Sequence, residues 1–300
     1  MKNKIGVVTV TYNSADVLDD FLDSVNTQTH KDFLLYVIDN DSKDDTAEII
    51  GKVKDKRIVY IQNNENVGVA AANNQGIKHA FEDGCDFVLF LNNDTLFADD
   101  TFEKLLQGLK EYKADIVVPK MYYFDDREII WFAGGDFDKT FQCDVNHIGF
   151  KEKDMGQYDE VKEITYAPTC CMLVTKETID DVGLMDEKYF VYEDDVDFCY
   201  RATIQQKKKM ICMPDFQFYH KVGGLTNKEG SIFKSDFAIK YAIRNRVYMC
   251  KKYFSLKRGV YIGWFLIREN LHVLLQKRYK RSWHSFILLN KSFFSGLFYK

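Results

Sequence analysis

Four short apolar runs in the first hundred residues each end in a cluster of polar residues. The runs span residues 5–10, 34–38, 58–61 and 87–91. Segments with apolar residues at helical spacing separate them, and strands that alternate with helices in this way favour right-handed βαβ units. We therefore expect an α/β fold with a single, mostly parallel central sheet flanked by helices.

The polar clusters at the ends of these runs are candidates for one binding site. They are Thr11-Tyr12-Asn13, Asp39-Asn40-Asp41, residues 63–66 and Asn92-Asn93-Asp94. The carboxyl ends of parallel strands share one edge of a sheet, where ligands bind in open α/β folds. Turns and helix caps also favour Asn, Asp and Ser, but four clusters at one edge favour a site. An Asp there, such as Asp94, can hold a cation that in turn holds a phosphate.

The middle of the chain is less regular. Periodicity predicts a helix over 99–112, a strand over 115–118, a buried strand over 164–174 and a short helix over 176–182. Between 121 and 163, aromatic residues, glycines and mixed charges indicate irregular loops.

The sequence lacks the motifs of several nucleotide-binding classes. No Gly-x-Gly-x-x-Gly follows the first run and no Gly-x-x-x-x-Gly-Lys-Ser/Thr occurs, which disfavours a dinucleotide enzyme and a P-loop NTPase. A nucleotidyltransferase would need a Gly- and Lys/Arg-rich loop where Thr11 to Ser14 stands. The seven cysteines show no metal-site spacing, so we expect buried free thiols in a reducing compartment.

A second acidic group, Glu193-Asp194-Asp195, lies close to Asp197 and Arg201. A helix that begins near Asp194 places these acids in its first turn, where the helix dipole favours negative charge. Asp197 and Arg201 are then an i,i+4 pair with a structural role. Neighbouring carboxylates raise one another's pKa, so the run is a candidate general base or metal-side carboxylate.

The chain is predicted to be helical from Ser235, and its end is basic and aromatic. Residues 251–300 carry eleven Lys/Arg and one acid, although the whole chain has a net charge of −4. Such amphipathic helices suit an anionic membrane surface. The alternative is a helix pair that packs on the body or on a second subunit, which leaves a homodimer open. The acidic remainder of the chain disfavours nucleic acid as a partner.

No segment is predicted to cross a membrane or to direct secretion. The run at 5–10 is too short for the core of a signal peptide, and the longest later stretch, 259–267, is shorter than the roughly 20 residues of a spanning helix. We expect a protein that is soluble or peripheral to a membrane.

Several weak motifs follow one another in a specific order. They are Val10-Thr-Tyr-Asn13, Val37-Ile-Asp-Asn-Asp-Ser42, Asn66-Val-Gly with Asn74 and Gly76, Leu91-Asn-Asn-Asp-Thr95, Val182-Gly-Leu-Met-Asp186, Tyr192 to Asp197 with Arg201, His220, and Arg244-Asn245. Together, over about residues 4–250, they resemble the family 2 glycosyltransferases with the GT-A fold, and specifically their rhamnosyltransferase-like branch. The resemblance implies a Rossmann-like catalytic domain over 1–235, with a nucleotide-sugar half at about 1–118 and an acceptor half at about 119–235. A helical C-terminal extension over 236–300 would follow.

The resemblance also implies roles for the strand-end residues. Tyr12 and Asp39 would contact the nucleotide base, and Asn92, which replaces the first acid of the family's Asp-x-Asp motif, would contact the ribose. The remaining nucleotide-sugar residues are expected to be Thr11, Asn13, Asp41, Asn66, Gly68, Asn74 and Asn93. Thr169 stands where many relatives carry Gly, which leaves the acceptor pocket undefined.

For the chemistry, the resemblance implies a metal and a base. Asp94 would coordinate Mg²⁺ or Mn²⁺ bridging the diphosphate, and His220, which a Gly-rich segment follows, would be the second protein ligand. Asp195 would be the general base, although an alignment shifted by one residue makes it Asp194. The acceptor and donor-phosphate side is expected to include Glu193, Asp194 and Arg244.

The expected activity is an inverting, metal-dependent transfer of a sugar from a dTDP- or UDP-sugar. The acceptor is expected to be a hydroxyl of a saccharide or of a polyprenyl-linked oligosaccharide. The expected product is a surface polysaccharide of capsule or O-antigen type. The branch favours rhamnose, with UDP-hexose or galactofuranose as alternatives. A catalytically inactive nucleotide- or glycan-binding protein is the alternative from another class. The expected location is the cytoplasm, at the inner face of the cell membrane.

Overall fold

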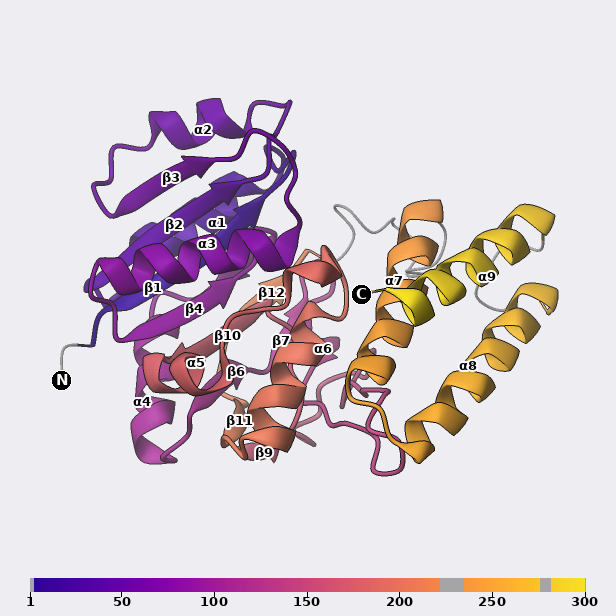
Figure 1. The fold of residues 1–300 in the computed structure, drawn as a ribbon. Coiled ribbons are helices and arrows are strands. Elements are labelled where there is room, and N and C mark those ends of the chain that lie inside the picture. Colours follow the sequence, from indigo (N-terminus) through magenta and orange to yellow (C-terminus); the bar gives the residue numbers. More distant parts are fainter. Residues whose placement is uncertain (1–2, 222–234, 276–281, 300) are drawn as a thin grey trace.

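The central element of the fold is a mixed, mostly parallel sheet of eight strands (Figure 1). The computed structural model describes residues 3–221, 235–275 and 282–299 of the chain. The strands lie in the order β3 (Ile58–Gln62), β2 (Phe33–Asp39), β1 (Ile5–Thr11), β4 (Phe87–Leu91), β10 (Cys171–Thr175), β6 (Ile116–Pro119), β11 (Met210–Met213) and β9 (Lys162–Ile164). The parallel pairing of β1 to β4 confirms that their carboxyl ends meet at one edge.

Helices cover the sheet, as the alternating pattern predicts. They are α1 (Leu18–Thr27), α2 (Thr46–Lys52), α3 (Val69–Glu82), α4 (Thr101–Glu111), α5 (Lys176–Val182) and α6 (Asp194–Cys199), which continues as a π-helix over Tyr200–Gln205. In Figure 1, α3 crosses one face of the sheet, where it packs on β1 and β2. An added Cβ at Gly76 of α3 would lie only 2.3 Å from Val8, so this glycine allows close contact between helix and strand.

The prediction of one continuous strand over residues 164–174 is wrong, because two separate strands contain its ends. Its first residue belongs to β9 at the edge of the sheet, whereas β10 begins only at Cys171 and pairs antiparallel with β4 and β6 in the centre. Pro168 lies between the two strands. Proline has no backbone N–H to donate to a ladder, so one continuous central strand cannot pass through it.

A second, smaller sheet was not predicted. It has the order β5 (Thr95–Phe97), β12 (Phe218–His220), β7 (Met121–Tyr123) and β8 (Ile130–Phe132). Two of its strands lie in the segment that we expected to be irregular, which consists largely of loops beyond β8. This sheet joins residues far apart in the sequence, because β12 pairs with both β5 and β7.

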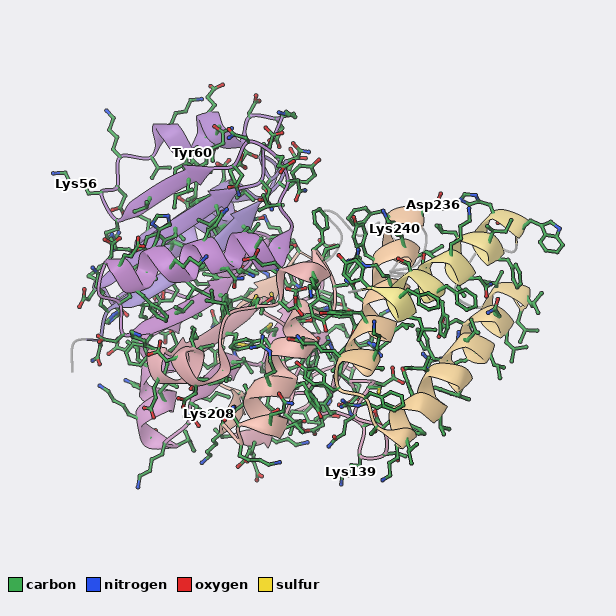
Figure 2. The ribbon with its side chains drawn as sticks, viewed as in Figure 1. Lys56, Tyr60, Lys139, Lys208, Asp236 and Lys240 are labelled. Atoms are coloured by element: carbon green, nitrogen blue, oxygen red, sulfur yellow. The ribbon has the colours of Figure 1, made fainter. Side chains whose placement is uncertain are left out.

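Three helices form the C-terminal part: α7 (Asp236–Lys252), α8 (Leu256–Leu274) and α9 (Trp283–Phe298). Each begins at a serine whose side chain accepts a backbone N–H from the first turn: Ser235, Ser255 and Ser282. Figure 1 shows α7 nearest the body, with α8 and α9 beyond it. In Figure 2, Asp236 and Lys240 mark the first turn of α7.

A separate hydrophobic cluster holds these three helices together. Buried side chains from all three contribute to it, including Ile243 of α7, Phe265 of α8 and Phe293 of α9. Gly296 lets α9 approach α7 closely, since an added Cβ would lie 2.3 Å from the carbonyl oxygen of Arg244. Within the described ranges, no helix has the length and apolarity required to span a bilayer.

Candidate active site

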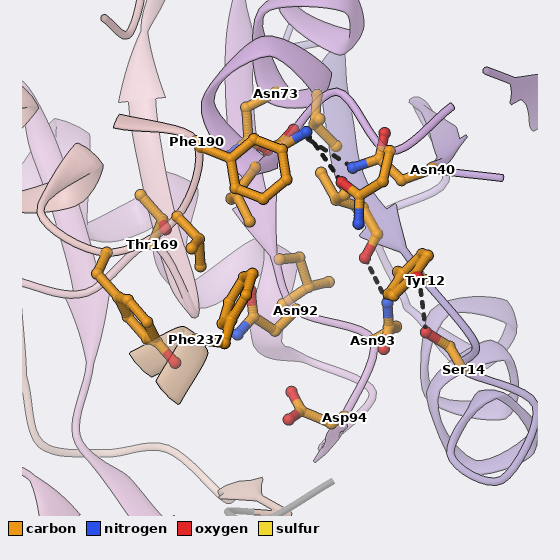
Figure 3. Close-up of a pocket in the computed structure, with 18 of the residues that line it drawn as sticks. Tyr12, Ser14, Asn40, Asn73, Asn92, Asn93, Asp94, Thr169, Phe190 and Phe237 are labelled. Carbon is orange, nitrogen blue, oxygen red and sulfur yellow. Dashed lines mark hydrogen bonds between the residues drawn. The ribbon is translucent and has the colours of Figure 1, made fainter. Parts of the chain in front are cut away.

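A cavity of about 750 Å³ lies where the central parallel strands end. All four predicted polar clusters contribute to its wall, which confirms that they converge. The predicted residues among its lining are Tyr12, Asn66, Gly68, Asn92, Asn93 and Asp94. In Figure 3, Tyr12 and Thr169 lie on opposite sides of the cavity and Asp94 lies at one end.

Thr11 and Asp39 lie behind this wall. Both are fully buried, and the Thr11 hydroxyl donates to Asp39 Oδ1 over 2.7 Å. Ser42 donates its hydroxyl to the same oxygen over 2.6 Å and its backbone N–H to Oδ2 over 3.0 Å. The Asp39 carboxylate therefore fixes the loops that follow β1 and β2, and these loops carry Tyr12 and Asn40 to the cavity.

Three other predicted residues also position loops. Asn13 has a φ of 51° and accepts the backbone N–H of Lys43 over 2.7 Å, whereas Asp41 has a φ of 64° and pairs with Lys43 Nζ over 2.6 Å. Asn74 is buried in α3, where its amide exchanges two hydrogen bonds of 2.9 Å with the backbone of Met185. Asn74 thereby fixes the segment that leads to the 3-10 helix Glu187–Tyr189.

The small sheet brings Asp94 and His220 together. Antiparallel pairing of β12 with β5 places His220 opposite Thr95, and Lys221 donates its backbone N–H to the Asp94 carbonyl over 2.8 Å. As a result, His220 Nε2 lies 3.2 Å from Asp94 Oδ1. These residues are 126 positions apart in the sequence, and their pairing is predicted only by the resemblance.

The Asp94–His220 pair fits a divalent cation. Asp94 Oδ1 is buried, and its contact with His220 Nε2 at 3.2 Å is an ion-pair contact rather than a well-aligned hydrogen bond. Buried polar atoms nearly always form a well-aligned hydrogen bond, so a buried carboxylate oxygen that lacks one is consistent with an ion ligand. No third His, Cys, Asp or Glu joins them within the described ranges. The remaining ligand positions are thus available to other oxygen donors, such as a diphosphate.

The acidic run begins in an unusual loop. Phe190, Tyr192 and Glu193 have φ values of 60°, 63° and 67°, which non-glycine residues rarely adopt. The Asn245 amide of α7 contacts the carbonyls of Tyr189, Val191 and Tyr192 over 2.7 to 2.9 Å and so holds this loop in place. Such backbone strain persists where the surroundings impose it, often at functional sites.

Asp194 and Asp195 begin α6 just beyond Tyr192, which lines the cavity. Burial raises the pKa of both carboxyl groups. The charge of Asp195 and that of Glu193 raise the pKa of Asp194 further, and the charge of Glu193 raises that of Asp195. Asp194 is buried, whereas Asp195 is partly exposed and its Oδ2 accepts a hydrogen bond of 3.1 Å from the Tyr166 hydroxyl. Asp195 is therefore the better placed of the two to meet a substrate.

Two arginines of α7 contact the segment in front of α6. Arg244 donates to the carbonyls of Lys188 and Tyr189 over 3.0 and 3.2 Å. Arg246 forms a two-pronged ion pair of 2.8 and 2.7 Å with Glu193. Arg244 and Glu193 were expected near the acceptor, but here both take part in fixing the loop.

The predicted pair of Asp197 and Arg201 is confirmed. Arg201 Nε lies 2.8 Å from Asp197 Oδ2. The other oxygen, Oδ1, accepts hydrogen bonds from the hydroxyls of Tyr189 and Tyr253 and from Lys252. Asp197 is fully buried and joins α6 to the C-terminal helices.

Several residues of the site carry no distinctive sequence signal. Asn40, Asn73, Phe190 and Phe237 line the cavity, and Tyr166 binds the candidate base. Of these, only Asn40 lies in a strand-end cluster that was predicted to contribute to the site. The two phenylalanines resemble ordinary core residues in the sequence, and only the tertiary structure brings them to the cavity.

Comparison with known proteins agrees with this geometry. The profile of glycosyl transferase family 2 matches residues 6–183. A curated relative, the dTDP-rhamnosyl transferase RfbF of Shigella flexneri, is 25% identical over 282 residues, which cover 92% of this chain and 87% of RfbF. The chain also matches longer curated relatives, and it spans only 18% and 32% of the length of two of them.

Solved structures show the same fold at low sequence identity. Residues 1–349 of S. aureus TarS in complex with UDP-GlcNAc are 16% identical with a TM-score of 0.62, over 96% of this chain and 79% of that TarS chain. A mannosyltransferase from Pyrobaculum calidifontis in complex with GDP-Man and Mn²⁺ is 17% identical with a TM-score of 0.57, over 83% of this chain and 63% of that one. The architecture is therefore GT-A, and because the family profile covers more than half of its residues, the chain belongs to glycosyl transferase family 2.

Proposed function

We propose that this protein is an inverting, metal-dependent glycosyltransferase that moves a sugar from a nucleoside-diphosphate donor to a hydroxyl of a saccharide acceptor. The observation that carries this proposal is the Asp94–His220 pair at the end of a cavity built from parallel strand ends. Such a pair is suited to a cation that faces a diphosphate. The cavity is large enough for a nucleotide sugar, because ligand pockets typically measure about 300–1,000 Å³.

The donor binds along the ends of β1, β2 and β4. The ring of Tyr12, which is 38% exposed, packs against the nucleotide base, and the exposed amide of Asn92 meets the ribose. Asp94 and His220 would hold the cation, either Mg²⁺ or Mn²⁺. When bound, the cation supplies positive charge beside the diphosphate that departs.

Asp195 is the general base. Its carboxylate takes the proton from the acceptor hydroxyl while that oxygen forms a bond to the anomeric carbon, and the bond from this carbon to the diphosphate oxygen breaks. The nucleoside diphosphate leaves with that electron pair. A single displacement of this kind inverts the anomeric centre. The raised pKa of Asp195 suits this role, because a base with a higher pKa binds the proton more strongly.

We further propose that the donor is a dTDP- or UDP-sugar and that the product is a surface polysaccharide of capsule or O-antigen type. The match to RfbF along 92% of the chain supports rhamnose as the transferred sugar. A UDP-hexose or galactofuranose donor is the alternative, and the TarS structure, which has the same fold, contains a UDP-linked sugar. A polyprenyl-linked oligosaccharide as acceptor would place the enzyme in the cytoplasm at the inner face of the cell membrane.

A donor-turnover assay tests this proposal. The purified protein is incubated with dTDP-rhamnose or UDP-hexoses in Mn²⁺, with and without saccharide acceptors, and release of the nucleoside diphosphate is measured. We expect Asp195→Asn to abolish turnover but to retain nucleotide binding, whereas Asp215→Asn at an exposed loop should behave as the wild type. Undiminished turnover by Asp195→Asn would overturn the assignment of the base. Nucleotide binding without turnover in any combination would instead favour an inactive binding protein.

A further inference from the structure

One face of α8 exposes large apolar side chains along its whole length. They recur every three or four residues and are 47% to 85% exposed: Leu256, Val260, Trp264, Ile267, Leu271 and Leu274. The opposite face of α8 packs on the protein through Tyr261, Phe265 and Val273. α8 therefore has two apolar faces, one buried against the protein and one exposed to solvent.

The neighbouring helix α9 shows the same feature. Its exposed apolar side chains also follow helical spacing: Trp283, Ile287, Phe294 and Phe298, which are 49% to 80% exposed. Because α8 and α9 are packed together beyond α7, both stripes lie on the C-terminal part of the molecule (Figure 1). We call these ten side chains the apolar face. Monomeric soluble proteins rarely expose so many large apolar groups together, and such patches usually mark an interaction surface.

The sequence of the C-terminal segment is strongly basic. Residues 251–300 contain a single acid, Glu269, and this residue is 1% exposed and bonded to Arg268 over 2.7 Å. The described surface of α8 and α9 thus presents no exposed carboxylate. The same fifty residues carry eleven Lys/Arg, a net charge of +10.

We propose that the apolar face inserts into the surface of an anionic phospholipid bilayer, with α8 lying in the plane of the interface. Apolar side chains enter the boundary between headgroups and acyl chains while the basic residues meet lipid phosphates. No helix in the described parts of the chain is long and apolar enough to cross a bilayer, and the proposed insertion is into the bilayer surface. The two exposed tryptophans, Trp264 and Trp283, suit the interfacial zone.

A second copy of the chain is the competing occupant, and charge disfavours it. A two-fold dimer through this face would bring two identical surfaces together. Each copy would contribute a segment with a net charge of +10, and like charges at an interface oppose association. Anionic lipid neutralises the same charge.

Vesicle flotation tests this inference without donor or acceptor, so its result is independent of the transfer reaction. The test variant is Ile267→Gln/Leu271→Gln/Leu274→Gln, in which glutamine keeps the helix propensity high. The control, Phe150→Gln/Met155→Gln/Leu184→Gln, changes three exposed apolar residues of the body. Thermal unfolding verifies that both variants fold.

We expect the wild type and the control to float with vesicles that contain phosphatidylglycerol, and to float less with vesicles of phosphatidylcholine alone. The test variant should bind at least about tenfold more weakly, because each buried large apolar side chain contributes enough for a change of that order. Undiminished flotation of the test variant would overturn the inference. A wild type that fails to float but sediments as a dimer, which the same substitutions dissociate, would assign the face to a second copy.

Discussion

Gly68 sets the shape of the cavity through its lack of a side chain. Its φ is 87°, and an added Cβ would lie 2.5 Å from the carbonyl oxygen of Phe190, a residue of the cavity wall. With glycine at this position, the backbone N–H of the next residue, Val69, donates to the same oxygen with an N···O distance of 2.5 Å. The glycine thereby joins the start of α3 to the strained loop in front of the candidate base.

Replacing Gly68 by alanine should therefore weaken both folding and donor binding. We expect a loss of roughly 1–3 kcal/mol in the free energy of unfolding, from backbone strain and the displaced loop, and weaker nucleotide binding by calorimetry. Gly84→Ala is the matched control, since Gly84 has a φ of 73° but no atom within 4 Å of the added Cβ. Equal effects of the two substitutions would show that the close approach of Gly68 to Phe190 contributes nothing to stability or to nucleotide binding.

The acidic pair at the start of α6 should determine how the rate depends on pH. A base must be ionised to act, and burial raises the pKa of Asp195 above its usual value. We therefore expect kcat/KM to be constant at high pH and to fall as the pH drops through this raised pKa. The fall should occur well above the value of about 3.9 that is typical of Asp.

Tyr166→Phe should move this acid limb to higher pH. The Tyr166 hydroxyl donates to the Asp195 carboxylate over 3.1 Å and stabilises the charged form. Its removal should raise the pKa further. The control is Tyr122→Phe, which removes a hydrogen bond of 2.6 Å to Asp154 outside the cavity. An acid limb that stays in place or moves to lower pH in Tyr166→Phe would contradict Asp195 as the base.

At the scale of elements, α7 connects the C-terminal helices to the candidate base. Arg246 pairs with Glu193 directly before α6 and also with Asp144, whose Oδ1 accepts the Tyr261 hydroxyl of α8 over 2.7 Å. Burial opposes the charge on Arg246, but these acids outweigh it and raise the pKa of the guanidinium well above its usual value. The ion pairs of Arg246 with Glu193 and Asp144 thus form a charged and largely enclosed link between α7 and the start of α6.

Arg246→Met should leave the buried Glu193 carboxylate unpaired. Breaking a buried ion pair on one side costs about 3–5 kcal/mol, whereas removing both partners is often much less harmful. We expect urea unfolding to show a loss of about 3 kcal/mol for Arg246→Met and a smaller loss for Glu193→Gln/Arg246→Met. A double variant as unstable as the single one would indicate that the unpaired Glu193 carboxylate is not the main cause of the lost stability.

The elements also show what the sequence could and could not predict. The strands β1 to β4 and the helices between them follow from periodicity, because each strand is a short apolar run with a polar end. The strands β5 and β12 are only three residues long, which is too short to show an alternating pattern in the sequence. Their pairing nevertheless brings His220 to Asp94. The roles of Asn74 and Arg244 in holding loops depend on backbone partners that no sequence pattern reveals.

At the scale of the whole molecule, the C-terminal helices belong to the folded body. Leu289 and Phe293 of α9 and Phe265 of α8 share a buried cluster with Ile239 and Val247 of α7. Deleting residues 256–300 should therefore expose the α7 side of this cluster. We expect the truncated protein to unfold at a lower temperature or to aggregate. An unchanged melting temperature would show that α8 and α9 form an independent appendage.

The same arrangement joins the two proposed activities in one molecule. The cavity lies at the ends of the parallel strands, and α7, which carries Phe237 into its wall, also packs against α9. A bilayer bound at the apolar face of α8 and α9 would hold a lipid-linked acceptor near the enzyme. Binding to the membrane and binding of the donor nonetheless use different residues, so substitutions separate them.

The most direct test of the central claim is calorimetric titration of the protein with UDP, dTDP and GDP, in Mn²⁺ and again in EDTA. We predict that UDP or dTDP binds in Mn²⁺, that EDTA abolishes or strongly weakens this binding, and that Asp94→Ala has the same effect as EDTA. Failure of all three nucleotides to bind, or equal affinity with and without metal in both proteins, would contradict a metal-dependent nucleotide-sugar site at Asp94 and His220.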